Sequence, residues 1–295
     1  MPLNPARAHA LLFDVFGTCV DWRSTVTTAL HDQARTTLND PTASLATAVR
    51  LRATDLTFDD WGRFAQEWRN EYMKFTRGLA KALQEAEKPG GPPSSPAAFK
   101  SVDQHHLDSL KELLQRWRLD GLWTPAQVQR LSLVWHHLAP WPDASAGVEG
   151  LNAIPLPGGA AGGDGEGEAR LTTATLSNGN TALLLDLTAH ARLPFTRVFS
   201  AEDFAAYKPH PKVYLGAVER LGLRPEECVL VAAHLGDLRA AAACGLGTVY
   251  VARPREEDWS VEEVKRARKE GWVGLWVEEG EGGFGRVAEA LRQGA

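Results

Sequence analysis

The alternation of apolar and amphipathic segments after residue 170 constrains the fold of this chain more than any other feature. The apolar segments are short, and we expect them to form strands at 171–176, 197–200, 228–233 and 248–252, with a further candidate at 272–277. The segments between them have helical spacing, at 181–191, 212–221, 237–244 and 261–269. Strands that alternate with helices pair in parallel through right-handed crossovers. This half of the chain therefore predicts one sheet with helices on both faces.

The region before residue 170 has a different pattern. An apolar strand is expected at residues 9–16, and no convincing strand follows it between 22 and 139. Helical patterns occupy this interval, at 22–38, 58–83, 102–119 and 125–138, with breaks at 39–41 and in the proline-rich stretch 88–96. A helix at 145–152 and a glycine-rich loop at 155–168 lead back to the alternating region. We predict an α/β fold: a Rossmann-like, doubly wound core (1–20 plus 141–295) with a helical cap (21–140) inserted after the first strand.

Composition excludes several classes of function. The 295 residues carry a net charge of −5 and contain no run of Lys and Arg, which argues against a nucleic-acid partner. No apolar stretch approaches the roughly 18 residues of a membrane span, and the first eight residues lack the pattern of a signal peptide. The three cysteines, Cys19, Cys228 and Cys244, are too few for a disulfide framework and are not spaced as zinc ligands. We therefore expect a cytoplasmic protein.

The end of the first strand carries a candidate nucleophile. Asp14 directly follows the apolar run at 10–13, in the segment Asp-Val-Phe-Gly-Thr. In a doubly wound sheet the carboxyl ends of the strands bind the ligand, so a carboxylate there can attack carbon or phosphorus. Thr18 lies in the following turn, where its hydroxyl can bond to Asp14 or cap the next segment.

Polar residues also follow the other predicted strands. Ser177 and Asn178 end the second strand ahead of a helix, a position that suits both an anion site and an N-cap. Lys208 stands before Pro209, and Asp237 begins a helix after the strand at 228–233. A Lys beside a nucleophilic Asp would keep that Asp ionised. Taken alone, Lys208 would be a solvated loop residue and Asp237 a helix N-cap.

Four segments in this order resemble the four motifs of the haloacid dehalogenase superfamily, most closely those of its L-2-haloacid dehalogenase branch. They are 14–18 (Asp-Val-Phe-Gly-Thr), 176–179 (Leu-Ser-Asn-Gly), 207–211 (Tyr-Lys-Pro-His-Pro) and 231–237 (Val-Ala-Ala-His-Leu-Gly-Asp). The resemblance covers residues 8–20 and 170–252 well. It implies the same division into core and cap. It also implies that a 2-haloacid is hydrolysed through an aspartyl ester, without cofactor or metal, to halide and a 2-hydroxy acid.

The resemblance also implies roles for individual residues. Asp14 would be the nucleophile, and Lys208 and Asp237 would pair and help to activate the water that opens the ester. Ser177 and Asn178 would hold the substrate carboxylate. Tyr214, six residues after Lys208, matches a tyrosine that supports the site in the dehalogenases.

The cap would supply an arginine. The segment 67–73 (Glu-Trp-Arg-Asn-Glu-Tyr-Met) resembles the cap helix that carries the halide-binding arginine of the dehalogenases, which places that role on Arg69. An Arg over a dry pocket can bind a halide and a carboxylate. The alternative is an Arg on a solvated helix face. The aromatic residues of this region would form apolar walls or simply core, namely Trp61, Phe64, Trp68 and Phe75.

The choice between dehalogenase and phosphatase depends on two positions. Phosphatases of this superfamily have a second acid in the first motif and bind Mg²⁺ partly through an acid in the last. Here Phe16 replaces the first of these acids, where we expect it to contact substrate, and Ala232 replaces the other. A halide leaves without a proton, so both changes favour carbon–halogen chemistry. A Mg²⁺-dependent phosphatase remains the alternative, as does a diverged member with another substrate or no activity.

The last motif departs from the dehalogenase pattern. The Ser and Asn that precede the Asp in well-matched dehalogenases are missing here, where Ala233 or Ala232, and then His234, stand instead. His234 is expected to act as a donor or a base, or else to be a structural residue at a strand end. The pairs His105-His106 and His136-His137 are interpreted as surface or packing residues rather than metal ligands, because helix neighbours point about 100° apart. The apolar cap helices allow a homodimer.

Overall fold

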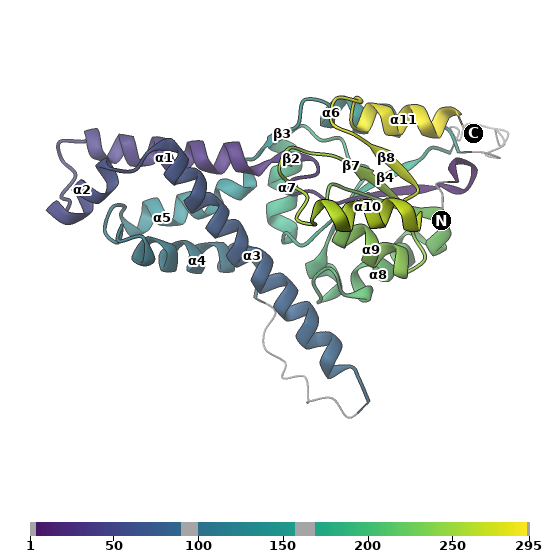
Figure 1. Cartoon of the computed structure of the whole chain (residues 1–295), viewed down its shortest axis with the longest axis horizontal. Helices are drawn as coiled ribbons and strands as arrows, with labels where there is room; N and C mark the ends of the chain where they lie inside the picture. Colours follow the sequence, from purple (N-terminus) through teal and green to yellow (C-terminus); the bar gives the residue numbers. More distant parts are fainter. Residues whose placement is uncertain (1–3, 90–99, 157–168, 294–295) are drawn as a thin grey trace.

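Two regions of different architecture lie side by side along the long axis of the molecule (Figure 1). The computed structural model describes residues 4–89, 100–156 and 169–293. A block of helices lies at one end and an α/β region at the other, and the long helix α3 (Phe58–Ala86) runs along the junction between them. The predicted combination of a Rossmann-like core with an inserted helical cap is confirmed. Most of the loops predicted at 88–96 and 155–168 lies outside the described residues.

The core is a six-stranded sheet whose neighbours all pair in parallel, in the order β5-β4-β1-β6-β7-β8. Its strands are β1 (Ala10–Phe13), β4 (Thr172–Ser177), β5 (Arg197–Ser200), β6 (Cys228–Ala232), β7 (Gly247–Val251) and β8 (Leu275–Val277). Chain order moves outward from β1 to β4 and β5, then returns to β6 on the other side of β1. The carboxyl ends of β1 and β6 therefore form the switch point at which doubly wound sheets bind ligands.

Helices cover both faces of this sheet. They are α6 (Ala144–Asn152), α7 (Thr181–His190), α8 (Pro211–Leu221), α9 (Leu235–Ala243), α10 (Val261–Glu270) and α11 (Phe284–Gln293), with short 3₁₀ turns at Pro5–Arg7, Ala201–Phe204 and Pro225–Glu227. Helices α6 and α11 lie on one side of the sheet, and α8, α9 and α10 lie on the other (Figure 1). Strand β1 is fully buried between these layers, which explains its uninterrupted apolar sequence.

Among its described residues, the cap contains five α-helices. They are α1 (Trp22–Asn39), α2 (Thr47–Thr54), α3, α4 (Val102–Arg116) and α5 (Pro125–Ser132), followed by a 3₁₀ turn at Leu133–His136. Strands β2 (Val20–Asp21) and β3 (Ala139–Pro140) pair antiparallel where the chain enters and leaves this block. Both strands lie close to the predicted boundaries between cap and core, at residues 20–21 and 140–141. The exact boundaries stay a prediction.

Aromatic packing gives the cap its interior. Trp61, Phe64 and Trp68 lie on one face of α3 and are almost completely buried, as core residues rather than pocket walls. Trp68 packs edge-to-face against Trp135, with ring centroids 5.4 Å apart. A capping box between Thr57 and Asp60 starts α3. The helical spacing of its apolar residues decides which side of α3 is buried.

Four elements were not predicted. Helix α2 buries only Ala53 along its length, so its sequence has little amphipathic signal. Strands β2 and β3 have two residues each, too few for a periodic pattern. The C-terminal helix α11 was overlooked although it buries one face against the core. The helix predicted at 125–138 is shorter in the structure: the α-helix ends at Ser132, and a 3₁₀ turn follows it.

Within the described ranges, no helix is both long and apolar enough to cross a bilayer.

Candidate active site

Asp14 lies at the switch point of the sheet. It follows β1 directly, and its backbone N–H donates to the Val231 carbonyl on β6 across 3.1 Å. Only 8% of Asp14 is exposed. A cavity of about 340 Å³ opens beside it, between one face of α3 and the loops that follow β6 and β7. The sheet thus presents a buried carboxylate to an accessible pocket.

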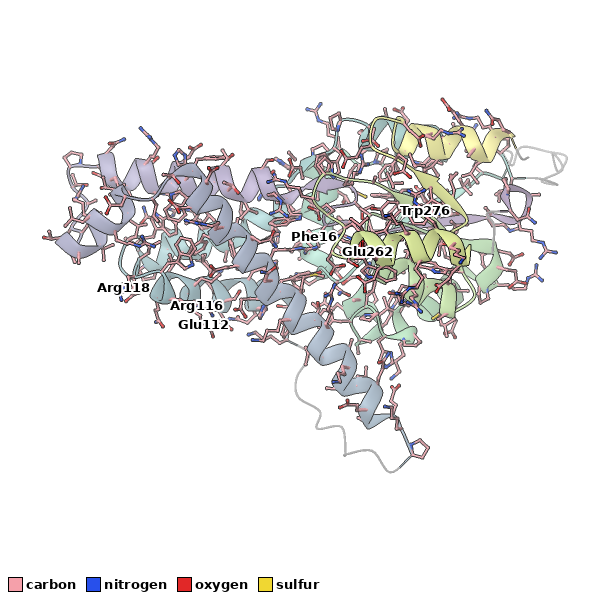
Figure 2. The ribbon with its side chains drawn as sticks, in the orientation of Figure 1. Phe16, Glu112, Arg116, Arg118, Glu262 and Trp276 are labelled. Atoms are coloured by element: carbon pink, nitrogen blue, oxygen red, sulfur yellow. The ribbon has the colours of Figure 1, made fainter. Side chains whose placement is uncertain are left out.

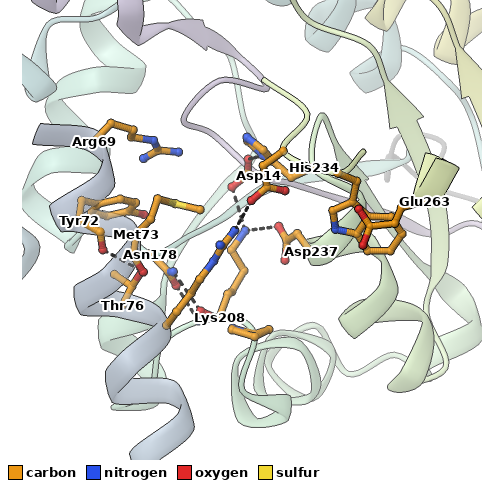
Figure 3. Close-up of a pocket in the computed structure, with 15 residues that line it drawn as sticks. Asp14, Arg69, Tyr72, Met73, Thr76, Asn178, Lys208, His234, Asp237 and Glu263 are labelled. Carbon is orange, nitrogen blue, oxygen red and sulfur yellow. Dashed lines mark hydrogen bonds and ion pairs between the residues drawn. The ribbon is translucent and has the colours of Figure 1, made fainter. Parts of the chain in front are cut away.

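The pocket is built from both regions of the chain. Figure 3 shows Arg69, Tyr72, Met73 and Thr76 along α3, opposite the core residues. Their helical spacing puts them on one face. The core contributes the other labelled side chains: Asp14, Asn178, Lys208, His234, Asp237 and Glu263. The site therefore exists only when the cap helix is packed against the core.

Both oxygens of Asp14 accept hydrogen bonds. Oδ1 accepts from Lys208 Nζ at 2.9 Å. Oδ2 accepts from Thr18 Oγ1 at 2.8 Å and contacts His234 Nδ1 at 3.0 Å. Burial by itself would raise the pKa of the Asp14 carboxyl, but Lys208 and His234 outweigh it and hold this pKa far below its usual range. Asp14 is therefore ionised at neutral pH.

Thr18 is fixed in turn by the backbone of the last motif. Its Oγ1 accepts the Ala233 N–H at 2.9 Å, so the hydroxyl proton is directed to Asp14. The preceding Gly17 has φ +84°, and a Cβ there would lie 2.0 Å from Oε2 of Glu256. Only glycine combines this backbone conformation with such a close approach. The first motif thus positions Asp14, Thr18 and a nearby carboxylate together.

Lys208 bridges two carboxylates. Its ammonium contacts Oδ1 of Asp14 and Oδ2 of Asp237, and only 7% of the residue is exposed. Burial alone would lower the pKa of Lys208, but Asp14 and Asp237 together raise it above its usual value. The Asn178 side chain fixes the Lys208 backbone, accepting its N–H at 2.7 Å and donating to its carbonyl at 3.3 Å. Lys208 is a rigidly held cation.

Asp237 and Tyr214 complete this side of the site. Asp237 lies in the first turn of α9 and its Oδ1 accepts the hydroxyl of the fully buried Tyr214. The burial of Tyr214, together with the nearby Asp237, raises the pKa of its phenol. Tyr214 stays protonated and donates, so it fixes the orientation of the Asp237 carboxylate.

His234 stands between two carboxylates at the end of β6. Its Nδ1 faces Asp14, and its Nε2 lies 3.4 Å from Oε2 of Glu256. Burial would lower the pKa of His234, but hydrogen bonds to Asp14 and Glu256 raise it to about 10. Glu256 itself is buried, and its Oε2 accepts the Trp22 indole N–H at 3.0 Å. Glu256 is not among the site residues predicted from the sequence. It lies in an acidic run just beyond the carboxyl end of β7, which was the available signal.

A pH dependence of stability follows from His234. Because its pKa rises on folding from an ordinary value of about 6.5 to about 10, its contribution is complete below pH 6.5 and is lost as the pH rises towards 10. We expect the difference in unfolding free energy between wild type and His234→Gln to shrink between these pH values in urea titrations. A constant difference would show that His234 is uncharged in the folded protein.

Arg69 reaches the site from α3. Its guanidinium carbon lies 4.6 Å from the Tyr72 ring centroid and 5.5 Å from that of Phe16. Nη2 donates weakly to the Phe16 carbonyl at 3.5 Å, whereas the buried Nη1 has no hydrogen-bond partner among the described residues. A buried guanidinium N–H without a partner is costly. Arg69 thus brings to the lining of the pocket a guanidinium with one unpaired N–H group, and such a cation suits an anion.

Three of the predicted substrate-binding residues are set back from this cavity. Among the described residues, its lining includes Asn178 and Arg69 but not Ser177, Phe16 or Tyr214. The Ser177 hydroxyl is fully buried and accepts the Gly179 N–H at 3.2 Å. Phe16 lies where the cap meets the core (Figure 2), with its ring edge-to-face against Tyr72. Tyr72, Met73 and Thr76, which line the cavity, were not predicted.

The groups around Asp14 do not suit a hard cation such as Mg²⁺. Both Asp14 oxygens face N–H and O–H donors, and Ala232 and Ala233 offer no side-chain oxygen at the end of β6. Within the part of the chain that the structure describes, no group of three or more His, Cys, Asp or Glu side chains is placed to hold a metal ion. His106, from one of the predicted packing pairs, stacks on Trp135 at 4.6 Å.

Comparisons with known proteins agree with this geometry. The chain is 32% identical over 255 residues to (S)-2-haloacid dehalogenase 1 of Pseudomonas sp. (strain CBS-3), covering 85% of this chain and 86% of that protein. Two solved L-2-haloacid dehalogenases superpose with TM-scores of 0.70 and 0.67. The first, a defluorinating enzyme, is 27% identical and the second 32%; they cover 99% and 98% of this chain and 100% of their own. The profile of the haloacid dehalogenase-like hydrolases matches residues 8–245, and the chain belongs to this family of hydrolases.

Proposed function

We propose that this protein is a 2-haloacid dehalogenase that hydrolyses short 2-haloalkanoic acids through an ester on Asp14. The observation that carries the proposal is the state of Asp14: a buried carboxylate kept ionised by Lys208 and His234, facing a pocket, with Phe16 where a phosphatase would have its general acid. The names of the relatives support the same chemistry. The proposed products are halide and a 2-hydroxy acid.

In the first step Asp14 attacks the substrate. Oδ1 is the better candidate nucleophile, because Oδ2 already interacts with two donors, Thr18 and His234. Oδ1 bonds to C2 from the side opposite the halogen, the carbon–halogen bond breaks with its electron pair, and the centre inverts. The free Nη1 of Arg69 takes the departing halide or the substrate carboxylate. Packing of α3 over the site limits access of bulk water.

In the second step water opens the ester. Water adds to Cγ of Asp14 and gives a proton to Asp237, and the charge moves to Oδ2. When Cγ–Oδ1 breaks, Oδ1 leaves with the product and takes a proton from Lys208, which contacts that oxygen. The new Asp14 carboxyl returns a proton to Lys208, and Asp237 releases one to solvent. Each turnover consumes one 2-haloacid and one water, and it releases one 2-hydroxy acid, one halide and one proton.

A Mg²⁺-dependent phosphatase is the less favoured alternative. It would need an acid that protonates the leaving group and oxygen ligands beside Asp14. The described residues offer Phe16 and Ala232 at these positions, and Lys208 and His234 occupy the space around the Asp14 oxygens. A halide needs no proton to leave, so the same set of residues suits dehalogenation.

The test is halide release from L- and D-2-chloropropionate in the presence of EDTA. We expect EDTA-resistant release from the L isomer, because the relatives are named for that configuration. Hydrolysis of a generic phosphate ester only when Mg²⁺ is added, without halide release, would contradict the proposal and favour the phosphatase. Inactivity in both assays would indicate a diverged substrate or loss of activity.

A further inference from the structure

Glu256 has no role in the two steps above, although it is buried against the site. Its Oε2 lies 3.4 Å from Nε2 of His234 and 3.0 Å from the Trp22 indole nitrogen. Only 8% of the residue is exposed. The chain makes room for it by having glycine at position 17, where a Cβ would lie 2.0 Å from the same oxygen. Burying a carboxylate costs free energy unless the charge is paired. We therefore expect the pairing of Glu256 with His234 to serve a function.

We propose that Glu256 keeps His234 protonated throughout turnover, so that His234 and Thr18 together stabilise the charge on Oδ2 of Asp14 while its ester is hydrolysed. This inference rests on the proposed dehalogenase function. It makes His234 and Thr18 an oxyanion hole and Glu256 a positioning residue that acts through His234. It also decides between the two roles, donor and base, expected for His234.

The hydrogen-bond pattern supports a doubly protonated ring. Nδ1 of His234 faces a carboxylate oxygen at 3.0 Å and Nε2 faces another at 3.4 Å. An ionised carboxylate only accepts, so each ring nitrogen must carry a proton to make its bond. A general base would need an unprotonated nitrogen directed at water. His234 has both nitrogens directed at carboxylates, and it therefore acts as a donor.

Glu256 matters most after the first step. In the free enzyme His234 faces two negative charges, Asp14 and Glu256. Formation of the ester removes the charge of Asp14, and Glu256 then remains as the carboxylate in contact with the ring. Other charged groups nearby are Lys208 beside Asp14, Arg69 facing Glu256, and Glu257 facing His234 without a hydrogen bond to it. Without Glu256 the two cations would favour loss of the His234 proton.

The geometry fits charge developing on Oδ2 specifically. Thr18 Oγ1 and His234 Nδ1 both approach this oxygen, at 2.8 and 3.0 Å, whereas Lys208 approaches Oδ1. When water adds to Cγ, the carbonyl electron pair moves onto Oδ2, and it returns when Cγ–Oδ1 breaks. Two preset donors aimed at that oxygen stabilise the intermediate, and removing one such donor typically slows a reaction about 10²- to 10³-fold.

The experiment separates the two steps with Glu256→Gln. Glutamine keeps the shape and can still accept from Trp22 and His234, so only the charge is lost. Rapid mixing with L-2-chloropropionate measures a first burst of halide (ester formation) and a later steady rate (ester hydrolysis), and mass spectrometry of the peptide with Asp14 measures the ester. The height of the burst gives the fraction of folded, active sites. Glu257→Gln is the matched control, the same change one residue away.

We expect Glu256→Gln to keep the burst and to accumulate the ester. At pH 8.5 a histidine with an ordinary pKa of about 6.5 is roughly 1% protonated, so the steady rate should fall about 100-fold relative to wild type. At pH 5.5 it should return to within about threefold, whereas wild type and Glu257→Gln should show no such inflection.

A burst and a steady rate that fall together, or a steady rate equal to that of wild type at pH 8.5, would overturn the inference while leaving the dehalogenase function intact. A wild-type protein that releases no halide at all would overturn both.

Discussion

Replacing Asp14 with Asn is expected to abolish halide release, with a loss of at least about 10⁴-fold in kcat, the scale seen when a covalent nucleophile is removed. The amide cannot displace halide from C2 at a useful rate. The fold should survive, because Lys208 keeps its contact with Asp237 and His234 keeps its contact with Glu256. The measurement is halide release from L-2-chloropropionate, together with the thermal unfolding midpoint of both proteins.

Isotope labelling supplies the independent check. In water enriched in ¹⁸O, a single turnover by wild type should place the label in Asp14, because water adds to Cγ while Oδ1 leaves with the product. The Asn variant should show neither the label nor an ester adduct. Label found directly in the 2-hydroxy acid after one turnover, with none in Asp14, would mean that water attacks C2 and that no covalent intermediate forms.

Replacing Lys208 with Met is expected to damage both stability and activity. Lys208 is the cation between Asp14 and Asp237, and breaking a buried ion pair from one side costs about 3–5 kcal/mol. Halide release should fall at least about 100-fold, because Asp14 loses the charge that holds its pKa low and Oδ1 loses its proton donor. Urea unfolding and halide release measure the two effects.

The same variant should show a defined pH dependence. The folded-state pKa of Asp14 is depressed, so the stability it contributes is present above the unfolded value of about 3.9 and is lost as the pH falls below it. The stability difference between wild type and Lys208→Met should therefore be largest near neutral pH and shrink in acid. Lys212→Met is the matched control: it removes an exposed Lys paired with Glu87, where about 0–1 kcal/mol is expected. Equal losses in the two variants would contradict the role of Lys208.

The residues that converge on Asp14 were largely predictable because they follow strands. Thr18, Asn178, His234 and Asp237 each come just after a strand, and parallel strands bring their carboxyl ends to one edge of the sheet. Lys208 is not at a strand end, and it was found through the resemblance of its Tyr-Lys-Pro-His-Pro segment to a known motif. The structure places its ammonium against both Asp14 and Asp237.

The residues that sequence analysis misplaced or missed depend on side-chain direction. Ser177 ends β4 as predicted, but its hydroxyl caps the Gly179 N–H away from the pocket lining. Phe16 follows Asp14 by two residues, yet its ring packs against Tyr72 and Trp135. Glu256 belongs to an acidic run whose members look alike in sequence, and only packing against Trp22 and His234 distinguishes it. The periodicity of a sequence predicts which face of a helix or strand is buried. It does not predict the direction in which the side chain of a loop residue points.

The α/β class, the helical insertion, the candidate nucleophile and the family could be predicted from residue order, because strand and helix periods and short motifs are local properties of the chain. How the charges of the site balance depends on the folded chain. Lys208, Asp14 and Glu256 come from three separate segments, and His234 and Asp237 come from a fourth. Their ion pairs form only once folding brings these segments within contact distance. Distance and desolvation set these interactions, and neither can be read from residue order.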